Sequence, residues 1–446
     1  MKKRALLAVL MAMTLLLSSC ALIVKDEAVD AATVILKMGD TEVTKAEVQD
    51  VAQNLLDQYA SMYGSSVDIT SADIISSARS SAVTQLKEDM VLRAKAKELG
   101  LDQLTEEETA EAKQLAQENL DYSISYIKAN YLADSGLEGE DLDKAVQEKL
   151  TEFGVSLETY EKTAVDQKLD DKLKEYIVKD VTVPDEDVQA DFDSKVASDK
   201  QKYENDAASW TTAANGTSGT TLYYTPAGIR RVKQILIKFL DADQTAIDEA
   251  KSRVTAATSK VTAAQELLDA EDATEEEKDQ AQKDLDAANT ELEEAQKALD
   301  EATAAGFANL DAEADAVLAE LEADPDSWDR LLEEKNADPG MQSGTTAEKG
   351  YAVSADMTSF DSAFVEAAMA LKSVGDISPK VKGASYGYYI IKYVGDEPEG
   401  AIDIETVKDD LRSSLLSTKQ NTVYNQQVEQ WVEDAGIEEN LGALNN

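Results

Sequence analysis

The chain has 446 residues, with 43 Lys and Arg against 89 Asp and Glu, and its formal net charge is −46. It contains no His and one Cys, which excludes Ser-His-Asp and Cys-His catalysis, His-ligated zinc or haem, cysteine zinc clusters and an intramolecular disulfide. Because affinity for nucleic acid depends on Lys and Arg that neutralise phosphates, the acidic balance argues against DNA and RNA as partners. We expect no metal and no cofactor, and the length is typical of roughly three domains.

The N-terminus predicts where the protein works. A positive segment, residues 2–4, precedes an uncharged apolar run over residues 5–17 that is too short to span a bilayer and is typical of a secretory signal. The run ends in Leu-Ser-Ser-Cys at residues 17–20, which resembles the bacterial lipobox. We therefore predict a signal peptide over residues 1–19, lipidation of Cys20, and anchoring at the extracytoplasmic face of the bacterial cell membrane. The alternative is an ordinary signal peptide with an incidental Cys.

The first half of the remaining chain predicts a helical lobe. Residues 20–32 read as a tether, and residues 34–43 as two short strands around a turn. Thr44-Lys-Ala-Glu47 is a capping box that begins a helix, and Gly100 ends the next one. Amphipathic helices continue from there, so we expect an N-terminal helical lobe over residues 33–183.

A linker and a strand follow. We assign residues 184–228 to a linker because the segment from Asp206 to Thr221 is small, polar and Gly-containing, as loops are. Residues 232–238 are rich in β-branched and apolar side chains and predict a strand.

A helical hairpin is predicted next, over residues 244–304. Apolar residues recur there at alternating spacings of three and four in two runs joined by a short acidic turn, which is typical of an antiparallel coiled coil. The sequence leaves open whether this arm grips clients or a partner, or is only a structural insertion. A long helix within residues 402–440 ends the chain, and we expect it to fold back onto the helical lobe.

The segments after the hairpin resemble a known family. Phe364 to Leu371 predicts a short amphipathic helix, Gly375-Asp-Ile-Ser a turn, and Tyr386 to Tyr393 a strand. With the hairpin removed, residues 229–397 resemble the parvulin peptidyl-prolyl isomerase domain, and the flanking regions resemble PrsA-type lipoprotein foldases and SurA-like periplasmic chaperones. The resemblance implies an α+β fold: a mostly helical chaperone lobe plus a parvulin-like α/β domain that carries a long antiparallel coiled-coil insertion.

The resemblance also implies site residues. Gln234 and Tyr389 stand where the parvulin family has its two histidines, and Asp338 falls at the acidic or Cys position that faces the proline. Gln and Tyr can still donate and accept hydrogen bonds. Both a slow isomerase and a module that only binds prolyl segments therefore remain open.

The apolar part of the implied site is retained. Phe360 and Phe364 correspond to the shelf for the proline ring, and Met369 to a further apolar wall.

The resulting hypothesis is a membrane-anchored extracytoplasmic foldase. Its partners would be unfolded or partly folded exported proteins with X-Pro segments, and the membrane through lipidated Cys20. The alternative is a non-catalytic lipoprotein scaffold that docks a secretion or cell-wall partner through the coiled-coil arm. A solute-binding lipoprotein is disfavoured because long uninterrupted helices replace repeated βαβ units, and a homodimer is left open.

Overall fold

The protein is an α+β chain made of two compact units. The computed structural model describes residues 27–216 and 219–445, so the predicted signal peptide and Cys20 lie outside the described residues. One unit is formed within Met1–Val183 and Ser413–Asn446, and the other is Pro184–Arg412. None of the helices in the described part of the chain is long and apolar enough to cross a membrane.

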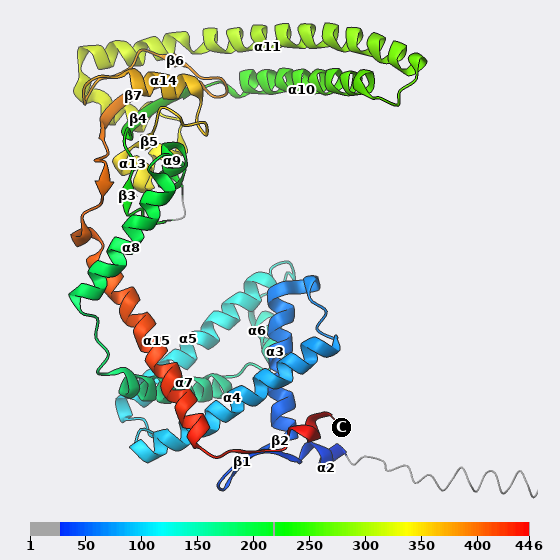
Figure 1. Ribbon diagram of the computed structural model, residues 1–446, viewed down its shortest axis with the longest axis vertical. Helices are drawn as coiled ribbons and strands as arrows, with labels where there is room; N and C mark the ends of the chain where they lie inside the picture. The colour runs from blue at the N-terminus through cyan, green and yellow to red at the C-terminus, as the bar shows by residue number, and fades with distance from the viewer. Residues whose placement is uncertain (1–26, 217–218, 446) are drawn as a thin grey trace, which may run out of the picture. The chain divides into compact units, whose positions relative to one another are not determined.

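The first unit contains a small sheet in the order β2-β1-β9. Strands β1 (Val34–Met38) and β2 (Thr41–Thr44) form the predicted hairpin, and β9 (Glu438–Glu439) from the end of the chain pairs antiparallel with β1. Next to β9, the Asn440 amide donates to the Ile35 carbonyl at 2.8 Å. The blue and red ends of the ribbon therefore meet in one sheet (Figure 1).

Helices make up most of the first unit. They are α2 (Glu27–Ala31), α3 (Lys45–Tyr63), η1 (Gly64–Ser66), α4 (Ala72–Leu99), α5 (Glu106–Asn130), α6 (Gly139–Glu152), α7 (Leu157–Val178), η5 (Leu441–Asn445) and the greater part of α15 (Lys408–Asp434). The predicted capping box is confirmed, since Thr44 and Glu47 exchange hydrogen bonds at the start of α3. Gly100 ends α4 in the left-handed conformation, as predicted.

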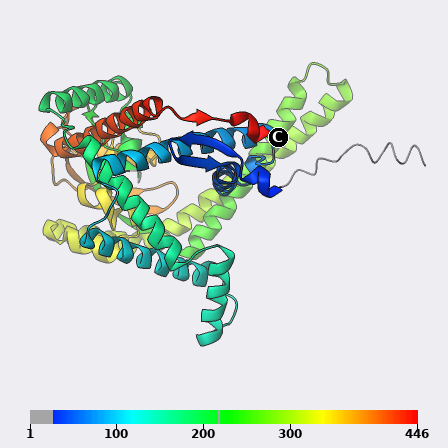
Figure 2. The same ribbon diagram turned by 90° about the horizontal axis from the view of Figure 1, so that it is seen from below.

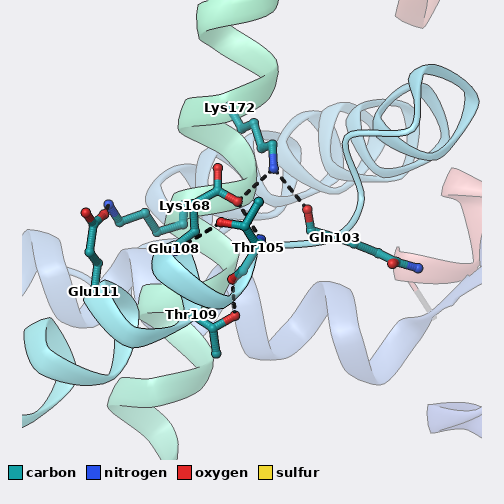
Figure 3. A network of polar contacts seen from close by, with 7 residues as sticks. All are labelled: Gln103, Thr105, Glu108, Thr109, Glu111, Lys168 and Lys172. Carbon is teal, nitrogen blue, oxygen red and sulfur yellow. Dashed lines mark hydrogen bonds and ion pairs between the residues drawn. The ribbon is translucent and has the colours of Figure 1, made fainter.

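A polar network joins α5 to α7 (Figure 3). Thr105 and Glu108 form a capping box at the start of α5, and Lys172 of α7 donates to the Glu108 carboxylate at 2.8 Å. Lys168, one turn earlier on α7, pairs with Glu111 at 2.5 Å. The Lys172 ammonium and the Thr105 amide lower the pKa of Glu108 to about 2.

The second unit is built on a four-stranded antiparallel sheet in the order β5-β4-β7-β6. Its strands are β4 (Arg230–Lys238), β5 (Tyr351–Val353), β6 (Val381–Lys382) and β7 (Gly387–Asp396). A separate pair consists of β3 (Tyr224–Thr225) and β8 (Gly400–Ala401).

Two long helices leave this sheet directly after β4. Helices α10 (Asp241–Asp269) and α11 (Glu275–Ala323) run antiparallel and pack along their length in both views (Figures 1 and 2). Small side chains form the buried seam and allow the close approach: Ala257, Ala264, Ala281, Ala288 and Ala295. The other helices of the unit are α8 (Asp185–Tyr203), α9 (Ala207–Asn215), η2 (Pro325–Ser327), α12 (Trp328–Lys335), η3 (Pro339–Met341), α13 (Gly344–Lys349), α14 (Ser362–Ala370) and η4 (Ile404–Thr406).

The two faces of the sheet carry separate cores, because side chains alternate along a strand. On one face, Ile235 and Ile390 pack against Trp328 and the aliphatic residues of α11. On the other face, Leu236 and Tyr389 lie opposite each other on β4 and β7 and pack against Phe364 of α14. The second face also carries the candidate site.

The segment 206–221, which we predicted as a loop, contains helix α9. Asp206 caps this helix by accepting from the Ser209 amide at 2.9 Å. Trp210 is buried and its indole N–H donates to the Tyr224 carbonyl at 2.8 Å, while the Asn215 side chain pairs with both backbone groups of Ala352. Tertiary contacts thus order a stretch whose local composition is typical of a loop.

Candidate functional site

A cavity of about 860 Å³ lies beside this second face of the sheet. Strands β4 and β7, the segment before η3, the start of α14 and the first turns of α10 contribute its walls. The cavity brings together five of the predicted site residues: Gln234, Asp338, Phe360, Phe364 and Tyr389.

The Asp338 carboxylate is the centre of the polar end of the cavity. It accepts from the Gln234 side-chain amide at 2.6 Å, from the Gly340 backbone N–H at 2.9 Å, and from the Tyr351 hydroxyl at 3.0 Å. Asp338 and Gln234 are each 8% exposed. A buried carboxylate needs hydrogen-bond partners, and these three donors supply them to Asp338.

Local backbone chemistry positions Asp338. The Asn336 side chain accepts from the Asp338 amide at 3.1 Å and from the Leu236 amide of β4 at 2.8 Å, which ties the turn to the sheet. A Cβ on Gly340 would lie 1.8 Å from the Tyr351 hydroxyl oxygen. Glycine at residue 340 is therefore required for the Tyr351 hydroxyl to reach Asp338.

Gln234 has one unsatisfied atom. Its Nε2 donates to Asp338, whereas Oε1 is buried and has no hydrogen-bond partner among the described residues. An unpaired buried acceptor costs free energy, on the order of 1–3 kcal/mol. Gln234 itself is part of the cavity lining.

Four aromatic rings form a continuous row along the cavity. Ring centroids are 5.1 Å apart for Tyr351 and Phe360, 5.7 Å for Phe360 and Phe364, and 5.4 Å for Phe364 and Tyr389. All three contacts are edge-to-face, a favourable arrangement for aromatic pairs. The row offers an apolar surface next to the Asp338 carboxylate.

Both tyrosines of the row keep their protons at neutral pH. Burial, followed by the nearby Asp338 carboxylate, raises the pKa of the Tyr351 phenol. Burial also raises the pKa of Tyr389, with Asp361 as the next cause. Each phenol is therefore a hydrogen-bond donor and not a nucleophile.

Met369 does not line this cavity, although we predicted it as a wall. It lies near the C-terminal end of α14, five residues after Phe364, which places it about 140° around the helix from that side chain. Met369 packs at the edge of the hydrophobic core on this face of the sheet, and its carbonyl accepts from Arg230 at 3.0 Å.

Sequence reasoning missed two parts of the site. The first is Tyr351, whose only local signal is its position directly after Gly350. The second is the base of α10, whose polar residues from Asp241 to Lys251 line the cavity. Among the described residues, no group of three or more Asp, Glu or Cys could hold a metal ion.

Comparison with known proteins shows partial sequence similarity to one group of curated proteins. No family model matches the chain. A Foldase protein PrsA of Clostridium kluyveri is 37% identical over 79 residues, 18% of this chain and 23% of that protein. A Foldase protein PrsA of Clostridium tetani is 29% identical over 126 residues, 28% of this chain and 35% of that protein.

This chain resembles the PrsA foldases. The predicted resemblance is thereby confirmed, over matches that span 23% to 35% of the curated relatives' length.

Solved structures of similar proteins include the peptidylprolyl isomerase PrsA of Bacillus anthracis, at 15% identity and a TM-score of 0.18, with 80% of this chain and 97% of that chain covered. A SurA-like chaperone of Campylobacter jejuni aligns at 14% identity and a TM-score of 0.23, over 91% of this chain and all of that one.

Proposed function

We propose that this chain is an extracytoplasmic foldase that is anchored to the membrane through Cys20 and assists the folding of exported proteins. In this proposal, the helical lobe holds unfolded segments and the parvulin-like domain, residues 229–397, engages X-Pro segments with weakened isomerase activity. The single observation that carries it is the cavity in which Asp338, held by Gln234 and Tyr351, adjoins a row of aromatic rings. The partial similarity to PrsA foldases supports the same function.

The cavity suits a prolyl peptide because it pairs an apolar floor with a fixed charge. A proline ring would lie against Phe360 and Phe364, with the preceding carbonyl near Asp338. Prolyl isomerisation breaks no covalent bond and needs only a weaker amide resonance. This resonance places partial negative charge on that carbonyl oxygen. An apolar surface and a nearby carboxylate both disfavour this charge, and so favour the twisted amide.

We propose slow catalysis because the polar network differs from that of the family. Gln234 and Tyr389 replace the histidines, and Tyr389 makes no hydrogen bond to Asp338; Tyr351 does so instead. A transition state that is stabilised by fewer interactions is reached more slowly, about tenfold for each 1.4 kcal/mol.

The helical lobe offers a surface suited to unfolded chains. Four aromatic side chains from the end of α5, the turn after it and the end of α6 form an exposed row, defined here as the aromatic patch: Tyr122, Tyr126, Tyr131 and Phe153. Their exposed fractions run from 44% to 71%, and they line a hollow of about 270 Å³. Contiguous exposed apolar surface of this kind is typical of interaction sites.

The test measures aggregation of several unrelated unfolded proteins in the presence of the chain. We expect suppression of aggregation by the parent, reduced suppression by a Tyr122→Ser/Tyr126→Ser variant, and no change for Glu118→Gln, an exposed site on the same helix. Binding of one ligand without any effect on unfolded proteins would instead favour the scaffold that docks through the coiled-coil arm.

A further inference from the structure

The first three turns of α10 form one wall of the cavity that contains Asp338. Four residues at spacings of three and four line it over about 15 Å of helix: Asp241, Gln244, Asp248 and Lys251. The seam with α11 uses a different face of α10, whose buried residues in these turns are Ile247 and Ala250. The insertion therefore presents a second, polar face to the cavity.

Hydrogen bonds hold this wall against the loop that follows β6. Lys251 Nζ donates to the Ala384 carbonyl at 3.1 Å and to the Ser385 hydroxyl at 3.3 Å. On the other side of the loop, the Ala384 amide donates to Asp361, the residue that caps α14. The loop is thus bound between α10 and α14, so the base of α10 has a defined position relative to the cavity.

The charges of the cavity lining are unequal. It contains four carboxylates against two ammonium groups: Asp241, Asp248, Asp338 and Asp361 against Lys238 and Lys251. Asp338 and Asp361 are engaged by backbone amides, and Lys251 by the loop. On α10, the Asp248 carboxylate accepts from the neutral Gln244 amide at 2.9 Å, and Asp241 lies 3.4 Å from Lys238 in a pair that is largely exposed to solvent.

A separate observation is an unpaired polar atom in a residue of the same lining. Gln234 Oε1, in a side chain that is more than nine-tenths buried, has no partner among the described residues and lines the same cavity. A backbone N–H is a donor of the kind that this atom lacks.

We infer that the α10 wall gives this cavity a preference for prolyl segments with Lys or Arg beside the proline, through Asp241 and Asp248. This inference rests on the proposed binding of X-Pro segments and adds the class of segment. Basic residues gain an attraction at the wall, and acidic residues are repelled by it.

The test measures the affinity of the full chain for fluorescent peptides that differ only in the residue before proline, with Arg, Ala or Glu at that position. Two solvent-exposed charge pairs give an expected Arg-over-Ala preference of roughly fivefold, and Glu binds weaker than Ala. The preference decreases at high salt. A fourth peptide with Ala in place of proline reports whether prolyl binding itself occurs.

Two variants with the same change in net charge separate the wall from the general acidity. Asp241→Asn/Asp248→Asn is expected to abolish the Arg preference, whereas Glu271→Gln/Asp272→Asn, in the exposed turn between α10 and α11, keeps it. Equal affinity of the parent for all three X-Pro peptides, or a preference that survives the first variant, overturns the inference and leaves prolyl binding standing. No discrimination between the Ala-Pro and Ala-Ala peptides contradicts the proposed function itself.

Discussion

The Gln234 amide donates to the Asp338 carboxylate at 2.6 Å, across a sequence separation of 104 residues. This hydrogen bond joins the central strand β4 to the turn before η3 and positions the Asp338 carboxylate at the polar end of the cavity. Gln234→Leu removes the donor and leaves a buried carboxylate short of one partner, which typically costs about 1–3 kcal/mol. We expect prolyl-peptide affinity to fall by roughly tenfold or more, measured by fluorescence anisotropy.

The matched variant is Gln234→Asn, which keeps the amide but shortens its reach by one methylene. An affinity that falls in Gln234→Asn as far as in Gln234→Leu shows that the reach matters and not only the chemistry. Unchanged affinity in both would contradict the role of this hydrogen bond.

Gly340 should tolerate no side chain. In Gly340→Ala the added Cβ would meet the Tyr351 hydroxyl at 1.8 Å, so the ring or the turn must shift. We expect destabilisation of about 1–3 kcal/mol, as for other overpacked sites, and we expect the Tyr351 hydroxyl to stop donating to Asp338. The control is Gly395→Ala on β7, where nothing lies within 4 Å of an added Cβ. Thermal unfolding followed by circular dichroism distinguishes the two, and equal melting temperatures would argue against the close approach.

A Trp210 variant measures how far tertiary contacts stabilise α9, the helix found where we expected a loop. Trp210→Phe keeps an aromatic ring but leaves the Tyr224 carbonyl without its 2.8 Å hydrogen bond. A destabilisation of roughly 1 kcal/mol is expected from the missing hydrogen bond. Trp431→Phe, on α15, serves as the control, because that indole is not tied to a carbonyl of this segment. Amide hydrogen exchange over residues 207–215 should rise in the first variant only.

A fall in pH should change the stability of the helical lobe in two opposite directions, because its carboxylates have pKa values shifted in opposite directions. Lys172 and Thr105 lower the pKa of Glu108 to about 2, so the stability it contributes is present above its ordinary value near 4.5 and is lost as the pH falls from there towards 2. Burial raises the pKa values of Asp89 and Asp170, so their contribution is present below the ordinary value near 3.8 and is lost as the pH rises through the raised value.

The variants Glu108→Gln and Asp89→Asn should therefore have opposite effects. At pH 7 we expect Glu108→Gln to lower the melting temperature and Asp89→Asn to raise it, and both differences should shrink towards pH 3. Glu107→Gln, an exposed neighbour of Glu108, controls for the change in net charge. A pH-independent difference for either variant would mean that titration is not its cause.

The sequence predicts local features of this fold well and long-range ones poorly. The capping box at Thr44 and the turn at Gly100 depend on residues within four positions of each other, and both are confirmed. The hydrogen bond from Tyr351 to Asp338, and the wall that α10 adds to the cavity, depend on distances between segments that no spacing encodes. Met369 lies outside the cavity lining, and a family position does not specify the rotation of a helix.

The central claim is most directly tested by a protease-free cis/trans assay on X-Pro peptides with the full chain, beside Asp338→Asn and Phe364→Ala. We predict a slow but measurable acceleration by the parent, which is reduced at least about tenfold when the Asp338 carboxylate is removed and is also reduced when the Phe364 ring is removed. Circular dichroism confirms that both variants fold. No acceleration by the parent at any enzyme concentration, with peptides that bind, would contradict catalysis at this site and leave the cavity a binding platform.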